Sequence, residues 1–165
     1  MSTMFRSLSA RNYRIWFIGA LVSNAGTWMQ STAQNWVVLT ELTNNDASAV
    51  GITMALQFAP PILLVPLTGW VADRFPRRRV LLVTQSLSAA LGVTIGVLLL
   101  TGLMTLPLMY VFAGTLGVIT AFDNPSRQAF VSDLVAHENM SNAVALNAGS
   151  FNMSRLVGPA LAGLL

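Results

Sequence analysis

The chain has 165 residues, of which 54% are hydrophobic and 9% are charged, and its formal net charge is +3. A soluble domain usually carries about 25% charged residues, so this chain cannot cover a globular surface with charge. Its basic residues are all arginines that stand between apolar stretches rather than along one polar face, which disfavours a nucleic-acid partner. Without cysteine, it has no disulfide and no thiolate metal site. The composition therefore favours a protein embedded in the lipid bilayer.

Charge-free stretches predict four membrane-spanning helices, and a further apolar stretch that holds one arginine predicts a fifth, because a helix of about 20 apolar residues crosses a bilayer. Residues 1–14 hold three arginines and form a polar segment ahead of the first span. Residues 15–165 are expected to form one transmembrane unit. Its predicted spans cover about residues 15–39, 49–72, 79–101, 106–124 and 141–165.

Arginine placement predicts the orientation of these spans. Eight of the nine arginines fall in segment 1–14 and in the loops after the second and fourth spans. The loops after the first and third spans contain no Lys or Arg, only Glu41 and Asp46. Since cytoplasmic loops are enriched in Lys and Arg, we expect a multi-pass protein of the plasma membrane with a cytoplasmic N-terminus.

The first span is polar along one side. At 100° per residue, four of its polar side chains between Ser23 and Gln34 fall within about 60° of one another, with Asn24 adjacent. Amide groups that face lipid are costly, so this side is expected to line a cavity or to pack against another helix, with Trp28 toward the other side. The candidate substrate-cavity residues are Asn24, Thr27, Gln30, Gln34 and Arg155.

The fifth span contains a cation, Arg155. An arginine well inside a span costs roughly 2.5–3.5 kcal/mol, so Arg155 should face the interior and have a partner. That partner is either a group of the protein, such as the carbonyl freed by Pro159 or a polar residue of the first span, or an anionic group on a bound molecule. The small residues around Gly158 share one face and predict close packing against another helix.

Residues 69–79, GWVADRFPRRR, place a compact group of charges between the second and third spans. The simplest interpretation is a topology determinant. The pattern G-x-x-x-D-R-x-x-R-R also resembles the signature loop of the major facilitator superfamily, with Pro76 where that family usually has glycine. The matching residues are Gly69, Asp73, Arg74, Arg77 and Arg78.

Two further stretches resemble one branch of that superfamily. DNPSRQAF after the fourth span and NAVALNAGSFNMSRLVGPALAG in the fifth are similar to the group that contains the enterobactin exporter and related drug-efflux permeases. The resemblance implies twelve helices in two six-helix halves, with cargo bound between them. The chain would then be an all-α membrane protein, the N-terminal five spans of that fold, and a fragment whose partner is the absent C-terminal half.

The resemblance also assigns a gating role to charged residues. In the superfamily, a network on the cytoplasmic side acts as a latch in the outward-facing state, which implies this role for Asp73, Arg78 and Asp123. Asp123 is placed at the cytoplasmic end of the fourth span, where Arg77 or Arg78 is expected to pair with it, and Arg127 follows in the loop. Pure topology remains the alternative to a latch.

Glycines and a proline complete the set of expectations. Gly69 is expected to permit close approach of neighbouring helices. In the fifth span, Gly158 and Pro159 followed by Gly163 resemble a motif found in exporters and rarely in importers, which implies a hinge and seal used in export. The alternative is an ordinary kinked packing helix.

The predicted function is secondary active export of small amphipathic molecules, such as a drug, a siderophore or a lipophilic metabolite, by alternating access in the bacterial inner membrane. No phosphate-binding loop occurs and His137 stands alone, so we expect no enzyme, no cofactor and no metal site. The expectation that protons are the coupling ion rests on the resemblance alone, because no carboxylate is expected inside a span. The alternatives are an importer of the same superfamily and a non-transporting remnant or assembly module.

Overall fold

The computed structural model describes residues 3–164, with side chains from Arg6 onward. Residues 1, 2 and 165, at the ends of the predicted segment 1–14 and of the predicted span 141–165, lie outside the described residues. Every regular element in the described part is helical. The elements are η1 (Thr3–Ser9), α1 (Arg11–Val37), η2 (Val38–Leu42), α2 (Ala47–Leu63), α3 (Val65–Arg74), α4 (Arg77–Leu100), α5 (Leu106–Leu134), η3 (His137–Asn139) and α6 (Met140–Ala162).

The turns between helices follow from local chemistry. Asp46 caps α2, because its carboxylate accepts a hydrogen bond of 2.8 Å from the backbone N–H of Ser48. The α4–α5 turn contains Gly102 at φ +68°, a conformation that only glycine adopts without strain. Pro107 stands in the first turn of α5, where its missing N–H has no helical acceptor to lose.

The second predicted span is two helices. α2 and α3 meet at Leu64 with a bend of 56°, so the helix over the predicted span 49–72 is broken near its middle. Pro60, Pro61 and Pro66 surround the break. Each proline lacks the N–H that would bond to the carbonyl four residues back, which weakens the helical ladder where the chain bends.

The fourth predicted span is longer than expected. The charge-free stretch places it at 106–124, but α5 continues to Leu134. Asp123, Pro125 and Arg127 therefore lie within the helix instead of at its end or in a loop. The charges that suggest a loop are buried and paired with each other, as described below.

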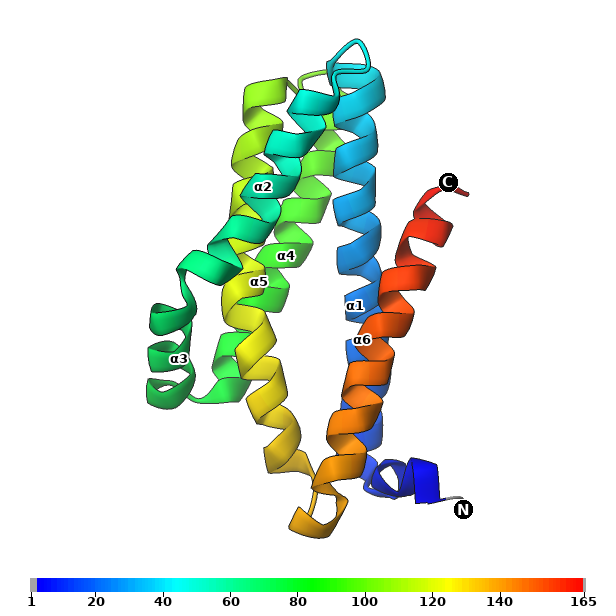
Figure 1. Cartoon of the computed structure of the whole chain (residues 1–165), viewed down its shortest axis with the longest axis vertical. Helices are drawn as coiled ribbons and strands as arrows, with labels where there is room; N and C mark the ends of the chain where they lie inside the picture. The colour runs from blue at the N-terminus through cyan, green and yellow to red at the C-terminus, as the bar shows by residue number, and fades with distance from the viewer. Residues whose placement is uncertain (1–2, 165) are drawn as a thin grey trace.

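The helices form two groups that are joined at both ends (Figure 1). α6 packs mainly along α1, whereas α5 packs against α2, α3 and α4. At the end where α1 turns into α2, an apolar cluster includes Val37, Leu91 and Met109. At the opposite end, a smaller cluster joins Tyr13 of α1, Val131 of α5 and Ala143 of α6. The polar side chains of the candidate site, described below, lie between these two clusters.

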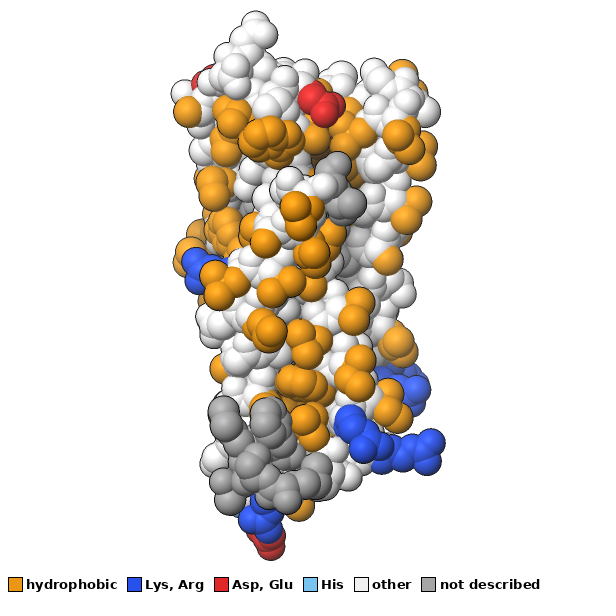
Figure 2. All heavy atoms as spheres, turned by 90° about the vertical axis from the view of Figure 1, so that its right-hand side faces the viewer, with side chains coloured by type: hydrophobic (Ala, Val, Ile, Leu, Met, Phe, Trp, Pro, Cys, Tyr) orange, Lys and Arg blue, Asp and Glu red, His pale blue; other side chains and the backbone are white. Residues whose placement is uncertain are grey.

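Length and apolar composition identify α4 and α5 as helices able to cross a membrane, and the bent pair α2–α3 makes a third crossing if it is one span. The expected five spans are therefore not confirmed, and α1 and α6 remain predictions. Many large apolar side chains are exposed, among them Val22, Ile62 and Leu156 at 70% or more. Figure 2 shows arginines gathered mostly toward the end of the molecule that holds the N-terminus, whereas acidic side chains are seen at both ends.

Candidate functional site

A cavity of about 480 Å³ lies between α1, α2, α4, α5 and α6. Its wall combines polar groups with large apolar side chains. The polar groups include Asn24, Thr27, Ser31, Gln57, Gln85, Asp123, Arg127 and Arg155, and the apolar ones include Trp28, Met54, Phe58 and Phe151. This mixture suits an amphipathic small molecule, because pockets for such ligands are mostly apolar with a few placed polar groups.

A buried ion pair forms one side of the cavity. Asp123 and Arg127 are one helical turn apart on α5, and Arg127 donates from Nε and Nη2 to Oδ2 of Asp123 at 3.0 and 2.8 Å. Their side chains are only 8% and 9% exposed. Both hydrogen bonds are charge-assisted and converge on one carboxylate oxygen, which leaves Oδ1 free to accept from other groups.

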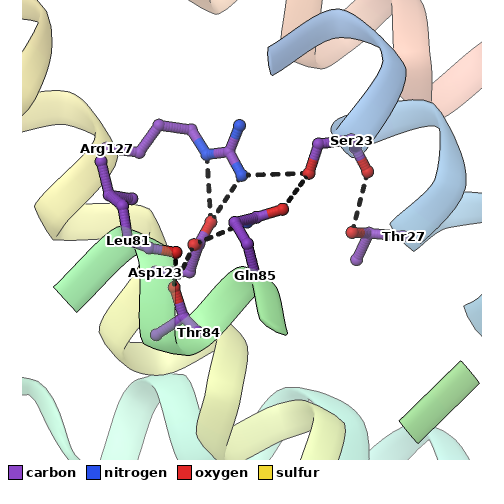
Figure 3. Close-up of polar contacts among 7 residues, drawn as sticks. All are labelled: Ser23, Thr27, Leu81, Thr84, Gln85, Asp123 and Arg127. Carbon is purple, nitrogen blue, oxygen red and sulfur yellow. Dashed lines mark hydrogen bonds and ion pairs between the residues drawn. The ribbon is translucent and has the colours of Figure 1, made fainter. Parts of the chain in front are cut away.

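The ion pair is tied to two other helices (Figure 3). On α4, Thr84 and Gln85 donate to Oδ1 of Asp123 at 2.6 and 2.8 Å. On α1, the hydroxyl of Ser23 donates to the amide oxygen of Gln85 and accepts from Nη2 of Arg127 at 3.4 Å. This network therefore connects α1, α4 and α5 through groups that are satisfied by one another.

The network corrects two expectations. The sequence places Asp123 at a helix end, paired with Arg77 or Arg78, but it lies inside α5, 6% exposed, and pairs with Arg127. The expectation that no span contains a buried carboxylate is likewise wrong. Hydropathy treats any charge as the end of a span, whereas an acid and a base one turn apart can neutralise each other within the helix.

The polar side of α1 divides between the cavity and the helix packing. Asn24 and Thr27 line the cavity as expected. Gln34 does not, because it is 1% exposed and its Oε1 accepts from Nε2 of Gln57 on α2 at 2.7 Å. Gln30 also lies outside the cavity, next to Gly92 of α4, where an added Cβ would stand 3.2 Å from its Oε1. The assignment of these two glutamines to the cavity is therefore wrong, and both follow the alternative of packing against another helix.

Trp28 is expected on the other side of α1, but it lines the cavity. Its ring makes an edge contact with Phe151 of α6, with 5.9 Å between ring centres. The guanidinium carbon of Arg155, one turn further along α6, lies 5.6 Å from the Trp28 ring centre. Sequence analysis missed Trp28 and Phe151 because it searched for polar groups. A signal was available, since Phe151 and Arg155 are four residues apart and so share a helical face.

Close packing of α6 on α1 depends on Gly158. A Cβ there would lie 2.6 Å from Cβ of Trp28 and 3.0 Å from the carbonyl oxygen of Ala25. The expected contact face is thus present at Gly158, and Ser154 on the same face is 1% exposed. α6 continues as a helix past Pro159, and Gly163 follows its last residue.

A second close approach was not foreseen. A Cβ on Gly117 of α5 would lie 2.6 Å from the carbonyl oxygen of Leu56 and 2.7 Å from that of Gln57. These are the carbonyls four residues before Pro60 and Pro61, which have no N–H to offer them. The proline pair and the glycine stand far apart in the sequence, so no local pattern connects them.

Comparison with known proteins identifies the family. A family model described as "Transmembrane secretion effector", one of the major facilitator superfamily, matches residues 2–165. The chain belongs to this superfamily. No solved structure matches it.

Several curated members of the superfamily are similar to the chain. It is 29% identical to the staphyloferrin A transporter of Staphylococcus aureus over 92% of this chain and 38% of that protein. It is 26% identical to macrolide efflux protein A of Streptococcus pyogenes, over 93% and 38% of the two chains. It is 29% identical to the class C tetracycline resistance protein of Escherichia coli, over 78% of this chain and 31% of that protein. The chain thus spans about a third of the length of the curated relatives it matches.

The loop that resembles the superfamily signature lies between α3 and α4. Arg77 donates from Nη1 to Asp133 at 2.7 Å and to the carbonyl oxygen of Ala129 at 2.9 Å, which ties the start of α4 to the last turns of α5. Asp73, Arg74 and Arg78 are exposed.

The expected latch contacts are thus not made within the described residues, where no hydrogen bond or ion pair of Asp73 or Arg78 is found. The expected close packing at Gly69 is also absent, because nothing described lies within 4 Å of a Cβ placed there. Within the described residues, no group of three or more His, Asp or Glu side chains is arranged to hold a metal ion.

Proposed function

We propose that the chain is the N-terminal part of a secondary active transporter that exports small amphipathic molecules by alternating access. The observation that carries the proposal is the cavity between α1, α2, α4, α5 and α6, which joins aromatic side chains to buried polar groups within an apolar helical bundle. Alternating access requires a second bundle that rocks against this one around the bound molecule. The relatives are about two and a half times as long as this chain, which leaves room for such a bundle.

Direction of transport is proposed from the relatives and from the fifth span. Two similar proteins are named for macrolide efflux and tetracycline resistance. Gly158 packs directly on Trp28 in the cavity wall, and Pro159, which follows it, is the kind of residue at which helices bend. A change at this contact would alter the cavity itself, which suits the proposed hinge and seal.

A bacterial inner-membrane protein with a cytoplasmic N-terminus is the proposed topology. The N-terminal segment, the α3–α4 turn and the α5–α6 turn lie toward the same end of the molecule (Figure 1). That end also carries most of the arginines (Figure 2), as the positive-inside rule requires of a cytoplasmic face. The latch proposed for Asp73 and Arg78 would act at this face, through partners outside the described residues.

The test is efflux by the full-length protein in a bacterial strain that lacks its main drug exporters. We expect cells that express it to accumulate less of at least one dye from a panel of anionic, neutral and cationic amphipathic dyes, compared with cells carrying an empty vector. Dissipating the proton gradient should raise accumulation if protons are the coupling ion. Equal accumulation of every dye in both strains would contradict the proposed function, provided that the protein is present in the membrane.

A further inference from the structure

Arg155 is a cation in the cavity wall without an acidic partner. Its guanidinium contacts the face of Trp28, and no hydrogen bond or ion pair joins it to another described residue. A cation–π contact of this kind leaves the N–H groups of the guanidinium free, because the ring attracts the charge without accepting hydrogen bonds in the plane of the fork.

The acidic residues of the chain cannot supply that partner in this arrangement. Of the six Asp and Glu residues in the sequence, Asp123 is the one that lines the cavity. Both of its oxygens are already engaged, Oδ1 by Thr84 and Gln85 and Oδ2 by Arg127. The charged groups in the wall are thus two arginines and one aspartate, so the lining has an excess of one positive charge.

The surroundings of Arg155 are aromatic. Trp28 and Phe151 meet edge to face beside the guanidinium, and Phe58 lies in the same cavity wall. A flat apolar group can pack against these rings while an attached anionic group reaches the guanidinium. Arginine is well suited to this role because its planar fork binds a carboxylate through two parallel hydrogen bonds.

We propose that Arg155 and Trp28 form a binding site for an organic anion, and that the cargo class is therefore an amphipathic molecule with a carboxylate next to an aromatic or other flat apolar group. The inference rests on the proposed transport function and adds the charge of the cargo to it. Arg155 binds the carboxylate and Trp28 positions both the arginine and the apolar part of the cargo.

The test compares matched probes on the full-length protein in lipid nanodiscs. The probes are 2-naphthoate, its uncharged methyl ester, and the cation 2-naphthyltrimethylammonium. Tryptophan is replaced biosynthetically by 5-fluorotryptophan, and the 19F resonance of Trp28 is assigned by its loss in Trp28→Phe. Empty nanodiscs correct for partitioning into lipid. The Trp28 resonance then reports binding in the cavity.

We expect 2-naphthoate to shift the Trp28 resonance saturably and to bind more tightly than the ester, with no saturable binding of the cation. Arg155→Gln should raise the Kd for naphthoate by about tenfold or more, because a pair of charge-assisted hydrogen bonds is lost. The Kd for the ester should stay unchanged. Arg155→Lys should raise the Kd for naphthoate less than Arg155→Gln does. The matched control Arg79→Gln removes a positive charge from the exposed first turn of α4 and should leave all three affinities unchanged.

Naphthoate binding that is equal to ester binding, weaker than binding of the cation, or absent would overturn the inference. The comparison of probes on the unmutated protein needs no variant, so it stands even if Arg155→Gln fails to fold. Export of neutral or cationic dyes without naphthoate binding would count against this inference alone. Naphthoate binding as expected in a protein that exports no dye would count against the proposed function alone.

Discussion

Asp123 and Arg127 form a buried ion pair within one turn of α5, with 2.8 Å between Oδ2 and Nη2. The pair lies in the cavity wall and is connected by hydrogen bonds to Thr84 and Gln85 of α4 and to Ser23 of α1. A buried charge is stable here only because its partner and the surrounding donors replace the water that it lost.

Removing one member of the pair should therefore destabilise the protein strongly. We expect Asp123→Asn to cost about 3–5 kcal/mol of unfolding free energy, because it leaves the Arg127 charge uncompensated. The double variant Asp123→Asn with Arg127→Gln should lose less than the two single variants added together. Denaturant unfolding in detergent, followed by circular dichroism, measures all of these in a double-mutant cycle. Additive losses would contradict the pairing.

Gly117 should not tolerate a methyl group. We expect Gly117→Ala to cost about 1–3 kcal/mol of stability, because its Cβ would lie 2.6 Å from the carbonyl oxygen of Leu56 and force α2 away from α5. Gly114, on the same helix, has nothing described within 4 Å of a Cβ added there. Gly114→Ala is thus the matched control and should be neutral or stabilising by up to about 1 kcal/mol. Thermal unfolding of both variants in the same detergent decides the point.

Gly158 gives a parallel test on the other helix pair. Gly158→Ala should separate α6 from α1 at Trp28 and lower both stability, by about 1–3 kcal/mol, and efflux. Gly149, on the same helix, has open space where a Cβ would stand, so Gly149→Ala should keep both properties. Equal efflux in the two variants would argue against a role for this contact in export.

The proposed topology can be mapped directly because the chain contains no cysteine. In full-length protein without other cysteines, Arg79→Cys should react with a membrane-impermeant maleimide only when the cytoplasmic face is accessible, as in inverted vesicles. Asn44→Cys, in the turn between η2 and α2, should react only from the outside of intact cells. The reverse labelling pattern would overturn both the orientation and the assignment of the latch to the cytoplasmic side.

The proposed latch predicts a loss of transport without a loss of protein. Asp73→Asn and Arg78→Gln should each reduce efflux by about tenfold or more by shifting the balance between outward-facing and inward-facing states. Membrane levels should stay normal, because both side chains are exposed and make no hydrogen bond or ion pair within the described residues. Arg79→Gln is the control, because Arg79 follows Arg78 in the first turn of α4 but stands outside the signature pattern. Unchanged efflux in both variants would leave these residues with a topological role only.

The sequence alone determined the class of protein, because the ratio of apolar to charged residues and the spacing of arginines depend on the solvent around each segment rather than on which helices touch. Apolar stretches predicted α4 and α5 as spans, and the loop and fifth-span patterns identified the superfamily that the comparison confirmed. Asn24, Thr27 and Arg155, which the sequence proposes as cavity residues, line a cavity in the structure, and their role toward a substrate stays a prediction.

Only the tertiary structure decided the partner of each polar group. A helical periodicity gives the angle between side chains on one helix, but it does not say which neighbour stands opposite them. Gln34 therefore bonds to Gln57 instead of facing the cavity, and Asp123 pairs along its own helix instead of with Arg77. The contact between Gly117 and the carbonyls before Pro60 and Pro61 joins segments that are distant in the sequence, and only the packed bundle brings them together.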